Sequence, residues 1–222
     1  PRHIPYGIAL LAAIAEKAGH QVAVYDANAH RQPISKVEDV CKADSWDVIA
    51  IGGLTTTYGF IKQACRIART AAPGSLIVAG GGFLTSMPAE VMTWIPEIDV
   101  GIVGEAFVTW PELLRSGRDY STLQGIIWRD RGEPVLNEAR PVIHDLDTLP
   151  WPAWHLFPLE IYFRNSSSLF SEEAYLATRR IDINASFGCS LICRYCWHLG
   201  TTGDMLVERD TAGRRDVVFT YG

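Results

Sequence analysis

The chain has 222 residues and a net charge of −5, and its mean hydropathy is +0.06. This length suits one full domain and part of another, and the composition is typical of a soluble globular protein. An acidic balance without a run of Lys and Arg argues against nucleic acid as the main partner, and the longest apolar runs are too short for a membrane span.

The chain opens on Pro1 rather than Met, and we expect it to be part of a longer protein. No basic segment followed by an apolar run marks a secretion signal, so we expect a cytoplasmic location. Two of the five cysteines, Cys41 and Cys65, lie in helix-like segments and are expected to be buried apolar fillers.

Helix and strand patterns alternate from the first residues to about residue 128. Apolar residues at helical spacing predict a helix over 6–20 that ends at Gly19, a good C-terminal cap. A β-branched apolar run at 47–53 predicts a strand buried on both faces of a parallel sheet. Further helices are predicted over 34–44, 58–74, 88–96 and 106–117, further strands over 21–27, 75–82 and 98–105, and a hairpin over 123–137 with its turn at Arg131–Gly132.

This alternation with short connections predicts a doubly wound α/β domain of the flavodoxin or Rossmann-like kind, with parallel strands and right-handed crossovers. The first helix has no strand before it, so an opening strand is expected to be missing. Near residue 141 the composition changes to a connector rich in Pro and aromatic residues, whose rings should pack onto a neighbouring domain. We therefore expect three parts, namely 1–140, the connector 141–177, and the beginning of a second domain at 178–222, which opens with a strand over 180–188.

Unusual residues stand at or just after the carboxyl ends of three of the predicted strands. The carboxyl ends of parallel strands share one edge of the sheet, where ligands bind. Threonine is also a routine helix cap and glycine a routine turn residue, but three such ends on one edge favour a nucleotide-like cofactor. No Gly-x-Gly-x-x-Gly or Walker loop supports a dinucleotide or ATP site. The residues concerned are Thr55, Thr56 and Thr57, then Gly80, Gly81 and Gly82, and finally Gly104 with Glu105 placed at a helix N-terminus.

Three cysteines, Cys189, Cys193 and Cys196, fall within eight residues after the strand predicted over 180–188. Their thiolates suit an iron–sulfur cluster or zinc, and a disulfide would leave one thiol over. A structural zinc site needs four ligands, and His198 is cramped as the fourth. Three thiolates on a four-iron cubane leave one iron open, as catalysis requires, which favours iron–sulfur with zinc as the alternative.

The spacing Cys189-x-x-x-Cys193-x-x-Cys196, with Tyr195 before the last cysteine, resembles the motif of the radical S-adenosylmethionine superfamily. The preceding domain resembles the cobalamin-binding domain that a large subgroup carries before a partial (β/α) barrel. The matching stretches are "IPYGIALLAAIAEKAGHQVAVYDAN", "VAGGGFLTSMPAEVM", "VGIVGEAFVTWPELL" and "LDTLPWPAWHLFP".

This resemblance implies three cofactors. The cysteines would hold a [4Fe–4S] cluster whose open iron chelates S-adenosylmethionine, with Tyr195 near the adenine, and reductive cleavage would release a 5′-deoxyadenosyl radical. Cobalamin would lie across the strand ends, its nucleotide tail reaching toward Thr55, Thr56 and glycines 80–82. The Asp-x-His-x-x-Gly motif of a histidine-ligated cobalt is absent, since Asn28 follows Asp26 at that spacing, and His30 is expected to be a surface residue.

The implied reaction is methyl transfer to an unactivated carbon of a small-molecule substrate. A flavodoxin or ferredoxin would supply electrons. Two alternatives stay open at this point. One is ring formation or oxidation of the cyclase type with the same cofactors, and the other is a binding protein whose cysteines hold structural zinc.

Overall fold

The computed structural model describes residues 4–143 and 145–165, residues 179, 181, 183, 184 and 187, and two strands, β6 (Met205–Arg209) and β7 (Arg215–Phe219). β6 and β7 pair antiparallel. The three clustered cysteines and Tyr195 lie outside the described residues, as does most of the strand predicted over 180–188.

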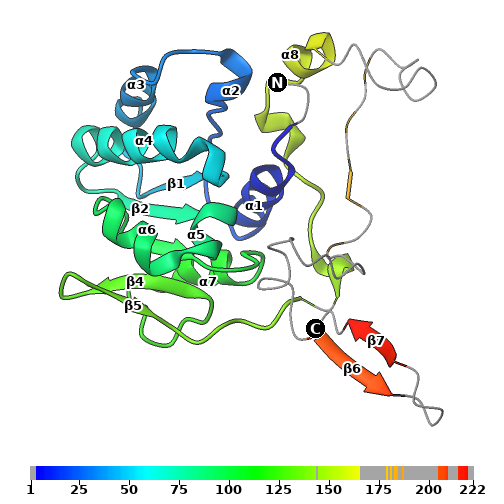
Figure 1. The fold of residues 1–222 in the computed structure, drawn as a ribbon. Coiled ribbons are helices and arrows are strands. Elements are labelled where there is room, and N and C mark those ends of the chain that lie inside the picture. The colour runs from blue at the N-terminus through cyan, green and yellow to red at the C-terminus, as the bar shows by residue number, and fades with distance from the viewer. Residues whose placement is uncertain are drawn as a thin grey trace.

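A five-stranded sheet in sequential order, β1 to β5, forms the centre of the described domain (Figure 1). The first three strands are parallel, and β4 and β5 close the sheet as an antiparallel hairpin. The hairpin turn is at Arg131 and Gly132, as predicted, and both have positive φ, 50° and 94°. The strands are β1 (Val48–Gly52), β2 (Leu76–Gly80), β3 (Val100–Ile102), β4 (Ile126–Asp130) and β5 (Glu133–Leu136).

Helices cover both faces of this sheet, which confirms the predicted α/β class. α1 and α7 pack on one face, while α3, α4, α5 and α6 pack on the other. In the part of the chain that the structure describes, no helix is long and apolar enough to cross a bilayer. The helices are α1 (Tyr6–Lys17), α2 (Ala27–His30), α3 (Lys36–Lys42), α4 (Tyr58–Ala71), α5 (Gly82–Ser86), α6 (Pro88–Trp94), α7 (Thr109–Arg115) and α8 (Leu159–Asn165), with short 3-10 turns η1 (Thr55–Thr57), η2 (Leu146–Thr148) and η3 (Trp154–Leu156).

Side chains of β2 alternate between the two apolar cores. Ile77 and Ala79 face the core under α4 to α6, whereas Leu76 and Val78 face the core under α1 and α7. This alternation follows from the two-residue period of a strand. Phe83, at the start of α5, is 1% exposed in the first of these cores. The two cores together bury both faces of β2 from Leu76 to Ala79.

The strand β1 is less buried than its sequence predicts. β1 is half-buried, with Ala50 and Gly52 exposed, whereas β2 is buried from Leu76 to Ala79. The reason is position, because among the described strands β1 pairs only with β2 and so lies at the edge of the sheet. An apolar run alone does not distinguish a central strand from an edge strand.

The strand predicted over 21–27 is also wrong. Residues 21–26 have no ladder partner among the described residues, and Ala27 already begins the short helix α2. Val22 and Val24 instead pack against Ala12 and Ala13 of α1. Alternating apolar residues show which side is buried, but a strand also needs a neighbour to accept its backbone hydrogen bonds.

The connector folds back onto the first domain. The N–H of Ala153 donates to the carbonyl of Ala9 in α1 at 2.9 Å, and the rings of Trp154 and Tyr6 lie 5.9 Å apart. Trp151 is the exception, since it is 80% exposed. The predicted aromatic packing is thus present, but α1 supplies its surface, and the connector contains two 3-10 turns and α8 rather than extended chain alone.

Candidate functional site at the carboxyl edge of the parallel strands

The loops after β1 and β2 meet at the carboxyl edge of the sheet. Gly52 at the end of β1 is in register with Gly80 at the end of β2. One residue further on, Gly81 has φ of +97°, and a Cβ built there would lie 2.6 Å from the carbonyl oxygen of Gly53. The fold itself therefore requires glycine at Gly81, independently of any ligand.

The three predicted threonines differ in their roles. Thr57 stabilises its own turn, because its Oγ1 donates to the carbonyl of Leu54 at 2.8 Å and accepts the Leu54 N–H at 3.2 Å. Thr55 and Thr56 are exposed in η1, and their hydroxyls have no hydrogen-bond partner among the described residues. The structure thus leaves the hydroxyls of Thr55 and Thr56 available to a ligand and assigns Thr57 to the turn.

The fold itself does not require glycine at position 80. Its φ lies outside the left-handed region, and a Cβ built there would meet only the Cβ of Ile102, at 4.0 Å. Gly82, by contrast, is the first residue of α5. A glycine that the protein could replace without strain, at the edge where ligands bind, favours a close approach by a ligand to the backbone.

Small residues stand beside Gly80 on the neighbouring edge strand β1. Residues paired in a parallel ladder point to the same face, so the Gly80 and Gly52 positions face the same side, and Ala50 faces it as well. Ala50 and Gly52 are both exposed. Sequence reasoning missed Ala50 and Gly52, although the two-residue period of β1 could have found them. Ala50, Gly52 and Gly80 together form a strip of small residues on this face of the sheet.

The third strand end needs a correction. Glu105 was expected at a helix N-terminus, but α7 begins only at Thr109. Glu105 instead accepts the backbone N–H of Ile143 on Oε2 at 3.2 Å, which ties the connector to this edge. Gly104 has φ of +83°, and its N–H donates to Thr85 Oγ1 at 3.1 Å. Both residues remain at the predicted edge, with Glu105 engaged by the chain itself.

Asp26 organises the neighbouring loop, a role that sequence reasoning missed. Its Oδ1 accepts the N–H of Ala29 at 2.9 Å and caps α2, and its Oδ2 accepts the hydroxyl of Tyr162 in α8. His30 is exposed and stacks on Tyr25, with ring centroids 6.4 Å apart. The prediction that His30 is a surface residue is confirmed. An Asp three residues before a helical N–H is the local signal that could have found the cap.

The two cysteines within the described residues are unsuited to metal binding. Cys41 is 4% exposed and Cys65 is fully buried. Burial raises the pKa of the Cys41 thiol, and mainly burial, with Glu97 nearby, raises the pKa of Cys65 to about 12. Metal ligation needs the thiolate, so both are apolar fillers, as predicted. Across the described residues, no group of three or more His, Cys, Asp and Glu side chains could hold a metal ion.

The chain belongs to the B12 binding domain family, whose pattern it matches over residues 1–114. This range contains the three strand ends described above, from β1 to Glu105. The exposed hydroxyls of Thr55 and Thr56 and the small residues Ala50, Gly52 and Gly80 thus lie within the matched range.

Comparison with curated proteins finds relatives that are methyltransferases and cyclases. The chain is 27% identical to the uncharacterized methyltransferase PH0819 of Pyrococcus horikoshii over 71% of this chain and 35% of the relative. It is 24% identical to cytidylyl-2-hydroxyethylphosphonate methyltransferase of Streptomyces wedmorensis over 96% and 47%. It is 28% identical to anaerobic magnesium-protoporphyrin IX monomethyl ester cyclase of Synechocystis over 88% and 38%. The chain thus spans between about a third and a half of each relative's length.

A solved structure shares the fold. The radical S-adenosylmethionine methyltransferase TsrM from Kitasatospora setae, with cobalamin and a [4Fe–4S] cluster bound, matches with a TM-score of 0.56 and 18% identity. The match covers 68% of this chain and 28% of TsrM. At this identity the likeness supports the α/β fold.

Proposed function

We propose that this chain is the cobalamin-binding part and the beginning of the radical domain of a cobalamin-dependent radical S-adenosylmethionine methyltransferase. The observation that carries the proposal is the B12 binding family match over a sheet edge with a strip of small residues, Ala50, Gly52 and Gly80. The division into 1–140, 141–177 and 178–222 is part of the proposal. The two methyltransferase relatives and the shared fold with TsrM support the reaction class.

The residues present suit these cofactors. Gly80, with the exposed strip beside it, would let the backbone approach cobalamin, and Thr55 and Thr56 would donate hydroxyls to its polar groups. Cys189, Cys193 and Cys196 would hold the [4Fe–4S] cluster, with Tyr195 beside the adenine of S-adenosylmethionine. When bound, these groups supply a carbon-centred radical and a transferable methyl group.

The chain's own residues would position the two cofactor regions relative to each other. Ile143 is bonded to Glu105, Ala153 to Ala9, and Tyr162 to Asp26, so the connector is fastened to the first domain at three points. The cysteine loop follows this fastened connector in the sequence. The proposal also includes a small-molecule substrate that is methylated at an unactivated carbon, a flavodoxin or ferredoxin as electron donor, and a cytoplasmic location.

A cyclase-type oxidation with the same cofactors is the second candidate, and the Synechocystis relative favours it. Product analysis distinguishes the two reactions. We expect the reduced full-length protein, when supplied with S-adenosylmethionine and candidate substrates, to form both S-adenosylhomocysteine and 5′-deoxyadenosine. The reason is that methyl transfer and radical formation each consume their own molecule of S-adenosylmethionine. Formation of 5′-deoxyadenosine alone would favour the cyclase, and absence of both products would contradict the proposal.

A further inference from the structure

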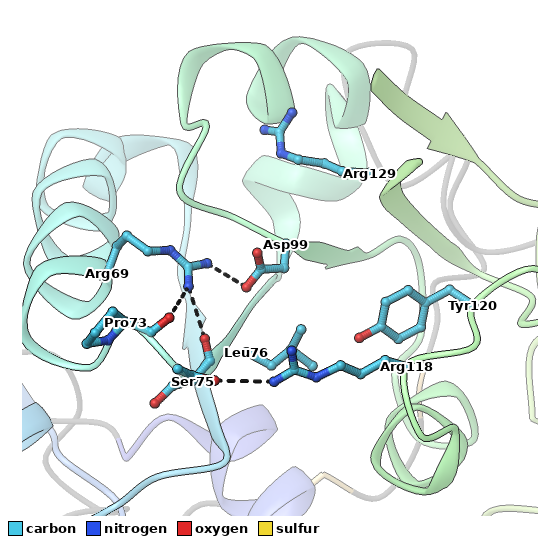
Figure 2. A pocket seen from close by; sticks show the side chains of 9 residues that line it. Arg69, Pro73, Ser75, Leu76, Asp99, Arg118, Tyr120 and Arg129 are labelled. Atoms are coloured by element: carbon cyan, nitrogen blue, oxygen red, sulfur yellow. Dashed lines mark hydrogen bonds and ion pairs between the residues drawn. The ribbon is translucent and has the colours of Figure 1, made fainter. Parts of the chain in front are cut away.

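A cavity lies at the opposite edge of the sheet, where the parallel strands begin. Its volume is about 210 Å³, and Leu76, the first residue of β2, lines it (Figure 2). The cofactor edge is at the other end of the same strand, beyond Gly80. The residues lining the cavity are Arg69, Pro73, Gly74, Ser75, Leu76, Asp99, Arg118, Tyr120 and Arg129.

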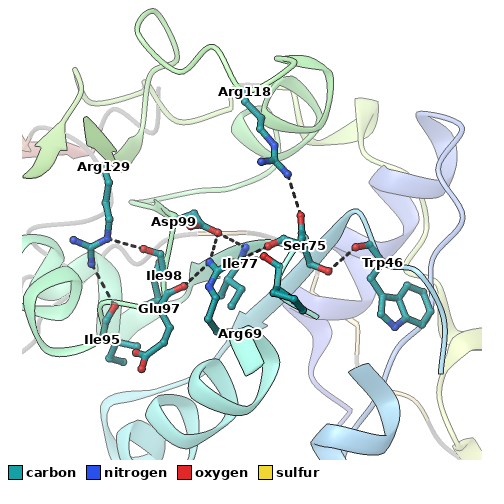
Figure 3. A network of polar contacts seen from close by, with 12 residues as sticks. Trp46, Arg69, Ser75, Ile77, Ile95, Glu97, Ile98, Asp99, Arg118 and Arg129 are labelled. Carbon is teal, nitrogen blue, oxygen red and sulfur yellow. Dashed lines mark hydrogen bonds and ion pairs between the residues drawn. The ribbon is translucent and has the colours of Figure 1, made fainter. Parts of the chain in front are cut away.

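Two of the three arginines already bond to partners within the protein. Arg69 reaches from α4 to Asp99 Oδ2 at 2.6 Å and donates to the carbonyls of Ser75 and Glu97. Arg129 donates from Nε to the carbonyl of Ile98 at 3.0 Å (Figure 3). Neither needs a ligand to satisfy its hydrogen bonds.

Arg118 differs from these two. Its guanidinium makes one contact among the described residues, from Nη2 to the carbonyl of Gly74 at 3.2 Å. No carboxylate of the described residues pairs with Arg118 or Arg129. The three guanidinium groups and the single Asp99 carboxylate leave the cavity with an excess of positive charge, and Arg118 keeps unused donors.

The hydroxyl of Tyr120 provides the second observation. Tyr120 is 8% exposed, and its hydroxyl is buried without a hydrogen-bond partner. Figure 2 shows its ring lying next to Arg118 with the hydroxyl directed into the cavity. Burial raises the pKa of this hydroxyl, with Arg118 lowering it and Asp99 raising it, so both charges are close. Buried hydroxyls without partners are rare, because an unmet hydrogen bond destabilises the protein.

We propose that this cavity binds an oxyanion, the phosphate or carboxylate group of a small ligand, between Arg118 and the Tyr120 hydroxyl. The free guanidinium donors and the hydroxyl donor are the groups that recognise such an oxygen. A phosphate dianion would also neutralise the excess charge. The site is separate from the cofactor edge and does not depend on the proposed function.

The test is thermal unfolding of the full-length protein loaded with cobalamin, so that the phosphate of that cofactor already occupies its own site. Sodium phosphate and sodium acetate are titrated against sodium chloride at equal ionic strength. We expect saturable stabilisation by phosphate or acetate, abolished in Arg118→Gln and weakened about tenfold in Tyr120→Phe, which loses one charge-assisted hydrogen bond. The stronger of the two anions identifies the oxyanion.

The matched control is Arg131→Gln, which removes the same charge from an exposed position that also has positive φ, 50° against 73° at Arg118. It should respond to phosphate as the unchanged protein does. The proposal fails if neither anion stabilises more than chloride, or if Arg118→Gln responds equally. Either result would show that the cavity does not bind an oxyanion.

Discussion

The substitution Gly80→Ala separates ligand approach from protein folding. The added methyl group would lie 4.0 Å from Ile102 Cβ, an ordinary contact, and the backbone is already in a region that alanine accepts. Restricting the unfolded chain should therefore leave the free energy of unfolding unchanged or raise it by about 0.4–1 kcal/mol.

Cobalamin binding should respond in the opposite direction. A methyl group inserted where the cofactor meets the strand costs about 1–3 kcal/mol, as overpacking does in protein cores. This cost corresponds to an affinity weakened roughly fivefold to 150-fold. The assay is titration of the full-length variant with cobalamin, followed by absorbance after removal of unbound cofactor, alongside urea unfolding to confirm the fold.

Gly74→Ala is the matched control. Gly74 lies two residues before β2, at the other end of the same strand, and a Cβ there would meet nothing within 4 Å. Its affinity for cobalamin should equal that of the unchanged protein. Gly81 is unsuitable for this test, because its Cβ would strike Gly53 and damage the fold itself. Unchanged affinity in Gly80→Ala would refute the proposed approach at β2.

Three further outcomes are expected. Cys193→Ala in the full-length protein should abolish iron binding and 5′-deoxyadenosine formation while cobalamin binding persists; loss of cobalamin as well would contradict the two-domain division. The free energy of unfolding should fall as the pH rises from 9.0, the ordinary pKa of a thiol, toward about 12, the pKa of Cys65 in the folded state. In this range the unfolded chain has lost the Cys65 proton while the folded protein still holds it. Urea unfolding of Cys65→Ala should lack this part of the pH dependence. An identical slope in both proteins would contradict the burial of this thiol. Phe83→Ala should lower the free energy of unfolding by about 3–5 kcal/mol, because Phe83 is 1% exposed in the core, and a loss below about 1 kcal/mol would contradict that packing.

Local signals predicted most of the fold. The helix that ends near Gly19 and the turn at Arg131–Gly132 depend on residues adjacent in sequence, and the structure has positive φ at all three. The prediction of a strand over 21–27 failed because a strand needs a neighbouring strand, which is distant in the sequence, to pair with. The helix predicted over 106–117 begins only at Thr109, because the half-buried residues 105–108 continue as a loop before α7.

The sequence indicated which residues lie at the carboxyl edge but not the part that each plays in the fold. Thr57 and Gly81 look like their neighbours in the sequence. Only the distances to Leu54 and Gly53 show that Thr57 stabilises its own turn and that the fold requires glycine at Gly81. The cavity where the parallel strands begin could not be predicted from the sequence, because Arg69, Arg118 and Tyr120 come from separate elements. Contacts across such separations depend on packing, which periodicity does not report.

Metal analysis of the full-length protein, purified without oxygen and supplied with cobalamin, tests the central claim most directly. We expect about one cobalt and about four iron atoms per chain, with the brown colour of an iron–sulfur cluster. A colourless protein that contains zinc and retains no cobalt would contradict both the cobalamin site at the carboxyl edge and the cluster at the three cysteines.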